Sequence, residues 1–484
     1  MVARFLGFDQ MLKTSRSSKL MCCCIISSLV VILITTWACP ESQVRLSTRA
    51  HTFEELVTKP SGINDPCAGK RIYMYDLPPK FNVALLERCG KKLVKWIDFC
   101  PHMQNYGFGQ MVSKSTAPPL FAKDWYGTDA YMLEVIFHAR MPRYKCLTNS
   151  ESEADAFFIP YFAGIDALNS LYTDNRTETL GPELVAWLQD NATDSWQRHG
   201  GHDHFLVAGR TAYDFARPLE GSFDNWGTTL LNLPELANIT DLTLEGRKWS
   251  GMEGRKWSEM DQAIPYPTGF HPATAGSLRK WTDQVLTVSR RYLFAFSGAL
   301  RPSMTTSIRG SLYDQCLRAT TRCSLLDCSK IKCSHNPVPI YSKLLLAEFC
   351  LQPRGDTATR RSVFDSIIAG CIPVFFHEDT AYDQYSWHLP TTDPQKFSVF
   401  IPEEGIKNGS IVVEEVLGSY SKSRISEMRD ELIKLIPGSL YRHPDCRDAV
   451  LTEKFRDAFD LSIDGMLKKV ASFKLSNAAT TVRS

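Results

Sequence analysis

Several motifs that identify common enzyme classes are missing from this chain of 484 residues. It contains no Gly-x-x-x-x-Gly-Lys-Ser/Thr and no Gly-x-Gly-x-x-Gly sequence, which argues against a nucleoside triphosphatase and a dinucleotide-dependent oxidoreductase. The absence of Asp-x-Asp weakens the case for carboxylates that hold a metal ion against a sugar nucleotide. A large charge excess is also missing: 55 Lys and Arg against 53 Asp and Glu leave +2, which argues against a nucleic-acid-binding protein.

The composition is that of a folded protein. Hydrophobic residues make up 44% of the chain and charged residues 22%, so a disordered or low-complexity chain is excluded. At roughly 150 residues per domain, the length predicts about three domains, or two large ones.

The one long apolar run lies near the N-terminus, over Leu20–Ala38, and it carries no charge. It is about long enough to cross a bilayer as a helix. Four basic residues and one acidic residue precede it, so the positive-inside rule leaves residues 1–19 in the cytosol and the body in the lumen. A cleaved signal peptide is the alternative, because Thr36 and Ala38 are small enough for a cleavage site. We expect a single-pass signal anchor followed by a polar stem over 39–66.

Two further patterns agree with a lumenal body. Glycosylation sequons stand at four positions, which are Asn175, Asn191, Asn238 and Asn408. Besides Cys22, Cys23, Cys24 and Cys39 of the anchor region, the chain has eleven cysteines, and in an oxidising compartment most of them should pair, with at least one left free. We expect Cys371 to be unpaired and buried, because it lies in an apolar, strand-like run.

One cysteine cluster allows a second interpretation. Cys316, Cys323, Cys328 and Cys333 are followed by His335, which invites a zinc site. However, the cluster holds no Cys-x-x-Cys pair, and the compartment favours disulfides.

Strands alternate with helices along the body and predict α/β layers. A second unit begins near Ala275, and within it a strand, a loop, a helix from about Thr359 to Ala369 and another strand form a β-α-β span. Gly370 is placed to end that helix. Strands are expected at 71–76, 156–161, 204–208, 292–296, 349–351 and 372–376, and helices also at 131–140 and 448–470.

A short tandem repeat interrupts the first half, as EGRKWSGM over 245–252 and EGRKWSEM over 253–260. Two copies are too few for a solenoid. The repeat is interpreted as a duplication in a surface loop or an error in the gene model.

The loop Pro353–Thr359 follows a strand and opens a helix, the place where ligands bind in open α/β sheets. Thr357 or Thr359 can cap the helix. Arg360 and Arg361 would then lie in its first turn, where the helix dipole disfavours cations, so an anion such as a diphosphate would compensate them. The alternative is that both arginines are solvated or paired with acidic neighbours.

Two more residues are candidates for the same ligand. Asp365 lies four residues after Arg361 on the same helical face, where it could pair with the arginine or accept hydrogen bonds from ribose hydroxyls. Arg301, just past the Ser297–Gly298 turn, could bind phosphate or be an ordinary surface arginine.

Six segments together resemble a known family. They are RIYMYDLPPKFN (71–82), FFIPYFAGID (157–166), HDHFLVAGRTAYDF (202–215), AIPYPTGFHP (263–272), FSGALRP (296–302) and FCLQPRGDTATRRSVFDSIIAGCIPVFFHEDTAYDQYSWHLP (349–390). They are similar to the exostosin-type glycosyltransferases of family 47, in the plant xyloglucan galactosyltransferase (katamari-like) branch. The resemblance covers roughly residues 65 to 470. Gly269 and Ala358 depart from the pattern, where an aromatic residue and a tyrosine or proline are expected.

The resemblance implies an α/β GT-B fold, with two Rossmann-like domains facing each other across a cleft. It implies inverting transfer of galactose from UDP-galactose to xylosyl side chains of xyloglucan, without a metal. The expected boundaries are 67–274 for the acceptor-side domain, 275–447 for the nucleotide-sugar domain and 448–484 for a C-terminal helix and tail. The expected nucleotide-sugar ligands are Ser297, Gly298, Arg301, Arg354, Gly355, Thr357, Thr359, Arg360, Arg361 and Asp365. The resemblance also implies a type II protein of the Golgi membrane that forms complexes with other Golgi glycosyltransferases.

An inverting transferase needs a base for the acceptor hydroxyl. Asp166, after a strand, is the first candidate, and His204 and Asp214 are the next.

Three alternatives stay open. A glycoside hydrolase would need two carboxylates flanking a bond, and the paired arginines argue against it. A non-catalytic lumenal scaffold is the second, and the intact FSGALRP and TRRSVFD segments argue against that. Within the family, galacturonic acid or arabinose could replace galactose, or another wall glycan could be the acceptor.

Overall fold

The protein is described by a computed structural model covering residues 66–90, 93–95, 97–113, 118–172, 178–222, 225–246, 260–300, 307–331, 333–355 and 357–481. All of these belong to one compact unit, His51–Ser484. The predicted anchor and most of the stem lie outside the described residues. Among the helices that the structure does describe, none combines the length and the apolar character that a membrane crossing requires.

The first sheet has six strands, and every neighbouring pair is parallel. The spatial order is β2-β1-β3-β4-β5-β6. The strands are β1 (Ile72–Met74), β2 (Leu147–Thr148), β3 (Ala156–Ile159), β4 (His204–Thr211), β5 (Thr240–Glu245) and β6 (Asp261–Ala263). Every residue of β3, β4 and β5 is buried, as a parallel sheet with both faces covered requires.

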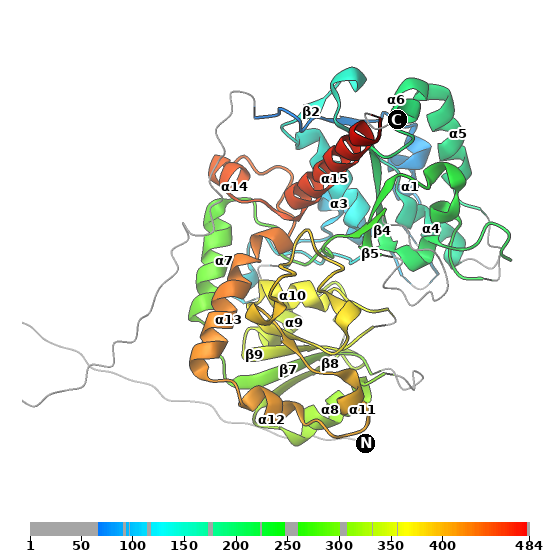
Figure 1. Ribbon diagram of the computed structural model, residues 1–484. Helices are drawn as coiled ribbons and strands as arrows, with labels where there is room; N and C mark the ends of the chain where they lie inside the picture. Colours follow the sequence, from blue (N-terminus) through cyan, green and yellow to red (C-terminus); the bar gives the residue numbers. More distant parts are fainter. Residues whose placement is uncertain are drawn as a thin grey trace, which may run out of the picture. The chain divides into compact units, whose positions relative to one another are not determined.

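Helices cover both faces of this sheet (Figure 1). α3 packs with Phe158 and Phe205 in one hydrophobic cluster, and α5 packs with Phe157 and Leu206 in another. The helices of this part are α1 (Val83–Leu86), α2 (Cys100–Met103), α3 (Leu133–Arg140), α4 (Ala163–Leu171), α5 (Gly181–Asn191) and α6 (Thr193–Arg198).

The second sheet has five parallel strands in the order β11-β10-β9-β7-β8. Its strands are β7 (Tyr292–Gly298), β8 (Cys323–Asp327), β9 (Ala347–Gln352), β10 (Ile372–Phe375) and β11 (Val399–Phe400). Figure 1 shows α9 and α10 on one side of this sheet and α8 and α12 on the other. The helices from here on are α7 (Ala275–Thr287), α8 (Arg309–Arg318), α9 (Pro337–Leu344), α10 (Ser362–Ile368), α11 (Glu403–Lys407), α12 (Val413–Gly418), α13 (Lys422–Lys434), α14 (Ala449–Lys454) and α15 (Ala458–Thr481).

The predicted β-α-β span is confirmed as β9-α10-β10, and Gly370 follows α10 with φ +61°. The predicted start of the helix is wrong. α10 begins at Ser362 and Arg361 is its N-cap, so neither threonine caps it and both arginines precede it. The reason is tertiary, because Thr357 and Thr359 instead bond to a carboxylate of the first sheet.

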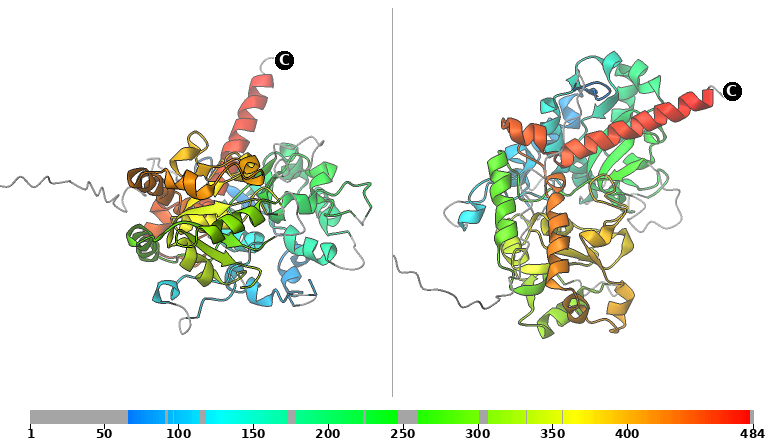
Figure 2. Two further views of the ribbon diagram at one scale, coloured as in Figure 1. Left: turned by 90° about the horizontal axis from the view of Figure 1, so that it is seen from below. Right: turned by 60° about the vertical axis from the view of Figure 1, so that its left-hand side comes forward.

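The predicted C-terminal helix over 448–470 is also corrected, because it is two helices, α14 and α15. Asp457 lies in the break between the two helices, where its carboxylate accepts a hydrogen bond from the Arg442 amide at 2.9 Å. α15 then packs against β3 and α3, with the rings of Phe459 and Phe137 of α3 4.5 Å apart. Figure 2 shows its last turns projecting beyond the sheets, where Leu475 is 72% exposed.

Among the described residues, ten of the eleven cysteines pair in five disulfides, and Cys446 is the free thiol. Disulfides, not zinc, account for the Cys316–Cys333 cluster. The expectation that Cys371 is unpaired is wrong, because it is bonded to Cys350. The parallel pairing of β9 and β10 brings the two residues together, which spacing alone does not reveal. The pairs are Cys67–Cys146, Cys89–Cys100, Cys316–Cys323, Cys328–Cys333 and Cys350–Cys371.

Three of the four sequon asparagines, Asn191, Asn238 and Asn408, are exposed, and Asn175 lies outside the described residues. Most of the tandem repeat, residues 247–259, also lies outside them, and its first residue, Glu245, ends β5. The predicted division at 274/275 and the other domain boundaries stay predictions.

Candidate active site

The carboxyl edges of the two sheets meet at Glu245, the last residue of β5. Its carboxylate accepts hydrogen bonds from the Thr357 hydroxyl at 2.7 Å and from the Thr359 amide at 3.4 Å, both in the loop after β9. Tyr266, in the segment after β6, donates to the same carboxylate at 2.7 Å. Ligands of open α/β sheets bind outside the carboxyl ends of the strands, so this junction is the candidate site.

The environment of Glu245 suits a general base. The side chain is 1% exposed, and burial raises its pKa to about 7. The negative charge of Asp214 acts in the same direction, while the hydrogen bonds from Thr357, Tyr266 and Thr359 oppose the rise. A carboxylate with a pKa near neutrality can accept a proton from a hydroxyl group more readily than an ordinary one.

A second buried carboxylate, that of Glu134 in α3, has a different role. Burial also raises the pKa of Glu134 to about 7. Its two oxygens accept hydrogen bonds from the amides of Gly164, Ile165 and Gly209, at 2.8 to 2.9 Å. Glu134 is therefore occupied in tying α4 to β4.

Arginines dominate the carboxyl edge of the second sheet. Arg360 donates to the carbonyl oxygens of Ser297 at 3.4 Å and Pro353 at 3.3 Å. Arg309, at the start of α8, donates to the carbonyls of Ala299 at 3.2 Å and Arg354 at 3.0 Å. Both side chains thus join the loop after β7 to the loop after β9 and concentrate positive charge there.

The backbone of these two loops comes close to the arginines. A Cβ added to Gly298 would lie 3.1 Å from Arg360, and one added to Gly355 would lie 3.6 Å from Arg309. Two buried polar atoms here, Ser297 Oγ and Arg354 Nε, have no hydrogen-bond partner among the described residues. Arg354 also pairs with Glu403 at 3.3 Å. A ligand rich in acceptor oxygens would suit such an edge.

Arg361 and Asp365 are directed inward. Arg361 donates to the Thr128 carbonyl and lies 3.5 Å from the Asp365 carboxylate. Asp365 is 2% exposed and accepts a hydrogen bond from Tyr341 at 2.9 Å. Burial raises the pKa of Asp365, and the charge of Arg361 opposes that rise. Of the two roles left open for Asp365, this geometry favours the ion pair over contact with ribose.

Asp214, just past the carboxyl end of β4, is near the site. It accepts hydrogen bonds from Arg210 at 2.7 Å and from the Trp226 indole at 2.6 Å. The Arg210 guanidinium in turn lies over the Tyr131 ring, 4.3 Å from its centroid. Asp214 is 6% exposed, so it acts on the site through its charge near Glu245.

Asp166 has a structural environment. It lies in the first turn of α4 and is 5% exposed. It accepts hydrogen bonds from the Tyr161 hydroxyl at 2.6 Å and from the amide of Leu180, the N-cap of α5, at 2.7 Å. Burial raises its pKa, and these two hydrogen bonds oppose the rise. The contacts favour a role in joining α4 to α5.

His204 lies at the wrong end of its strand for catalysis at this junction. It is the first residue of β4, and at about 3.3 Å per residue it is about 23 Å from Thr211 at the carboxyl end. The ring is fully buried, with Nδ1 bonded to Asp203 and Nε2 to Tyr75, each at 2.8 Å. Both ring nitrogens are thus engaged within the core.

Arg301 lies outside the described residues. Among those described, no group of three or more His, Cys, Asp or Glu side chains could hold a metal ion.

Sequence reasoning missed Glu245 and Arg309. The apolar alternation of TDLTL before Glu245 is the signal that could have revealed a strand ending there. Arg309 carries no local signal, because its partners are main-chain carbonyls 10 and 45 residues away.

Comparison with protein families identifies the chain. The model of the Exostosin GT47 domain matches residues 66–416. The chain therefore belongs to the exostosin GT47 family of glycosyltransferases, within its xyloglucan galactosyltransferase branch.

Its relatives in Arabidopsis thaliana support this placement. The probable xyloglucan galactosyltransferase GT12 is 42% identical over 433 residues, covering 88% of this chain and 80% of that protein. The xyloglucan galactosyltransferase MUR3 is 42% identical over 416 residues, covering 85% and 64%. The xyloglucan-specific galacturonosyltransferase 1 is 38% identical over 411 residues, covering 84% and 58%.

Among solved structures, the glycosyltransferase WaaG of lipopolysaccharide biosynthesis aligns over 66% of this chain and 96% of that chain. The identity is 11% and the TM-score 0.30, a likeness too slight to carry any argument.

Proposed function

We propose that this protein transfers galactose from UDP-galactose to xylosyl side chains of xyloglucan, with inversion at the sugar carbon. Relatives about 40% identical over most of the chain carry the name of that activity. The observation that carries the mechanism is the contact of Glu245, on the first sheet, with the loop after β9 on the second. The proposal includes a GT-B arrangement, which the two parallel α/β sheets support.

The second sheet would take the nucleotide. Developing charge on the UDP leaving group needs donors and cations, and the edge carrying Arg309, Arg354 and Arg360 supplies both. At Gly298 and Gly355 the lack of a side chain lets the guanidinium groups of Arg360 and Arg309 lie close to the main chain, so a diphosphate bound there would meet both kinds of donor. Thr357 and Thr359 add a hydroxyl and an amide.

The first sheet would activate the acceptor. Glu245 accepts the proton of a xylosyl hydroxyl as the acceptor oxygen bonds to C1 of galactose, and the bond from C1 to the UDP oxygen breaks. UDP leaves with the electron pair of that bond, so no other reactant is needed. For Glu245 to reach the acceptor, its hydrogen bond with Thr357 must break. The Thr357 hydroxyl would then donate a hydrogen bond to an oxygen of the UDP-sugar.

To test this proposal, the full-length chain is incubated with xyloglucan oligosaccharides as acceptors. UDP-galactose, UDP-galacturonic acid and UDP-arabinofuranose are supplied as donors in parallel reactions. EDTA is present, and product masses are recorded. Addition of one hexose from UDP-galactose in EDTA supports a metal-free galactosyltransferase. Loss of transfer in EDTA that returns with a divalent cation contradicts the metal-free mechanism. The absence of both transfer and UDP binding favours a scaffold.

A second candidate donor is UDP-galacturonic acid, because a galacturonosyltransferase acting on the same polysaccharide is 38% identical to this chain. In the same experiment, addition of a hexuronic acid would favour it while leaving the roles of the two sheets unchanged.

We further propose a type II protein of the Golgi membrane. Its support is the uncharged run Leu20–Ala38 with basic residues before it, together with five disulfides and three exposed sequon asparagines in the body. Protection of the body from protease in sealed Golgi vesicles, and its sensitivity to endoglycosidase, would test this topology. Digestion of the body in sealed vesicles would contradict it.

A further inference from the structure

The C-terminal end of α10 is held by side chains from three other segments. Its last carbonyl groups face inward, where unpaired acceptors would be costly. Each of three consecutive carbonyls accepts a hydrogen bond from a large side chain. The pairs are Trp281 Nε1 to Ile368 at 2.8 Å, Arg290 to Ala369 at 2.8 Å and Arg429 Nε to Gly370 at 3.2 Å.

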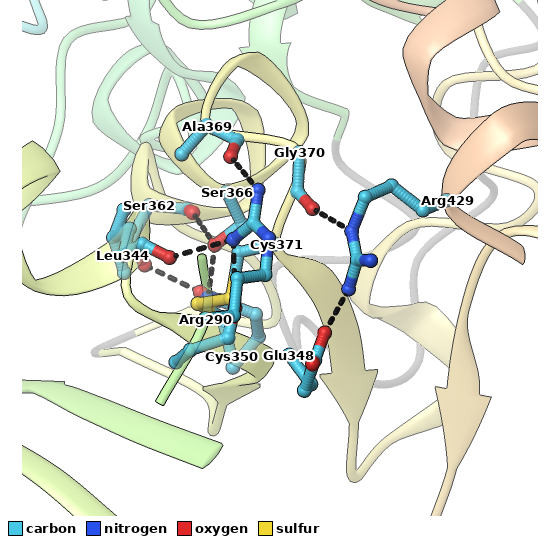
Figure 3. The surroundings of a disulfide bond; sticks show 12 residues. Arg290, Leu344, Glu348, Cys350, Ser362, Ser366, Ala369, Gly370, Cys371 and Arg429 are labelled. Atoms are coloured by element: carbon cyan, nitrogen blue, oxygen red, sulfur yellow. Dashed lines mark hydrogen bonds and ion pairs between the residues drawn. A yellow bond between two sulfur atoms is a disulfide. The ribbon is translucent and has the colours of Figure 1, made fainter. Parts of the chain in front are cut away.

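Arg290 joins this helix end to the strand before it (Figure 3). The same guanidinium donates to the carbonyls of Leu344 at 3.1 Å and Ala347 at 2.7 Å, where α9 ends and β9 begins. Burial lowers the pKa of Arg290 to about 9, so it remains a cation at neutral pH. A cation at a helix C-terminus is stabilising. Arg429 in turn pairs with Glu348 of β9.

A disulfide closes the same unit covalently. Cys350 in β9 and Cys371, immediately before β10, are 21 residues apart and buried. The closed segment, residues 350–371, contains the loop after β9 and all of α10, and Figure 3 shows the bond that closes it. Between the helix and Cys371 stands Gly370, at φ +61°. A Cβ there would lie 2.2 Å from Val285, so this tightly packed turn requires glycine.

The other end of α10 carries the candidate donor residues. The helix has only seven residues, and Arg361 is its N-cap. Arg360 and the threonines of the loop come directly before it. A helix this short moves as one body, so a shift at its pinned end displaces the loop at its start.

We propose that Trp281, Arg290, Arg429 and the Cys350–Cys371 disulfide, together called the α10 clamp, position the loop after β9 for the nucleotide of a UDP-sugar. This inference rests on the proposed donor site. The clamp residues are positioning residues: they act on the donor through α10 and do not contact it. Without the clamp the fold persists, but the loop samples more conformations and binds UDP more weakly.

The test removes the disulfide from the full-length chain as Cys350→Ala with Cys371→Ala. Its matched control is Cys67→Ala with Cys146→Ala, a disulfide on the side of the first sheet, which joins the segment before β1 to the residue before β2. Dissociation constants for UDP are measured calorimetrically, below the melting temperature of every variant. The clamp variant should bind UDP at least about tenfold more weakly, because small displacements of binding groups are costly, and the control should stay within about twofold of wild type.

A second, milder pair of variants keeps the test valid if the cysteine variants misfold. Arg429→Gln removes one clamp donor, and Arg424→Gln alters a partly exposed arginine of the same helix as its control. The UDP-sugar KM should rise for Arg429→Gln alone, with kcat and the acceptor KM unchanged. If Arg429 had only a structural role, the substitution would lower the melting temperature without raising the KM for the UDP-sugar selectively.

Three results would count against the account in distinguishable ways. Clamp variants that bind UDP as tightly as wild type would overturn the clamp alone. Equal weakening by clamp and control variants would also overturn it, since the effect would then be general destabilisation. A wild-type chain that does not bind UDP would overturn the donor site itself, and the clamp with it.

Discussion

The two sheets share a parallel topology but present opposite chemistry at their carboxyl edges. The first edge carries Glu245, bonded to Tyr266, with Asp214 close by. The second carries Arg309 and Arg360, whose guanidinium groups donate to main-chain carbonyls, and Arg354, which pairs with Glu403. Topology therefore sets where a site forms, and the side chains at the strand ends set its charge. The difference divides the proposed reaction into a base on one side and a leaving-group site on the other.

The largest expected effect comes from removing the charge of the first edge. Glu245→Gln keeps the size of the side chain and its ability to accept hydrogen bonds, but it cannot take a proton. We expect kcat to fall by about 10³-fold, within the usual range for a general base, while UDP still binds. Steady-state kinetics together with calorimetry separate these two effects. Wild-type turnover in Glu245→Gln would contradict the assignment of the base to the first edge.

A smaller effect is expected on the second edge. Arg309→Gln loses contacts to Ala299 and Arg354 and weakens the positive charge of the loop pair. We expect the KM for UDP-galactose to rise about tenfold to a hundredfold, with the KM for xyloglucan nearly unchanged. Arg318→Gln, an exposed position at the other end of α8, is the control. Equal changes in both KM values would contradict a donor-side role for Arg309.

The smallest effect on turnover is expected at Asp166. Asp166→Asn should leave kcat within about threefold of wild type, because its hydrogen bonds join α4 to α5 and do not reach Glu245. The melting temperature should fall, since hydrogen bonds to a charged group contribute about 1.5–3 kcal/mol each. Thermal unfolding beside kinetic assays checks both expectations. A loss of kcat as large as that of Glu245→Gln would restore Asp166 as the base.

The sequence predicts the β-α-β unit well, because short apolar strands and Gly370 carry local signals. It does not predict that α10 starts at Ser362, because this start depends on the hydrogen bond of Thr357 to Glu245, a residue 112 positions away in the chain. The Cys350–Cys371 pair depends on strand pairing in the same way. Of the arginine candidates for the donor side, Arg354 and Arg360 lie at the carboxyl edge of the second sheet, whereas Arg361 is directed inward. Of the base candidates, Asp214 lies near Glu245, whereas His204 and Asp166 do not, because position along the chain does not distinguish the two ends of a strand.

The most direct test of the account is the pH dependence of kcat/KM for UDP-galactose, because this ratio reports ionisation in the free enzyme. Burial raises the pKa of Glu245 to about 7, so the carboxylate needed as base is lost as pH falls below that value. We predict an ascending limb with a midpoint at about pH 7 in the wild type, and its absence from the residual activity of Glu245→Gln. A limb that persists unchanged in Glu245→Gln would contradict the assignment of Glu245 as the base facing the donor loop.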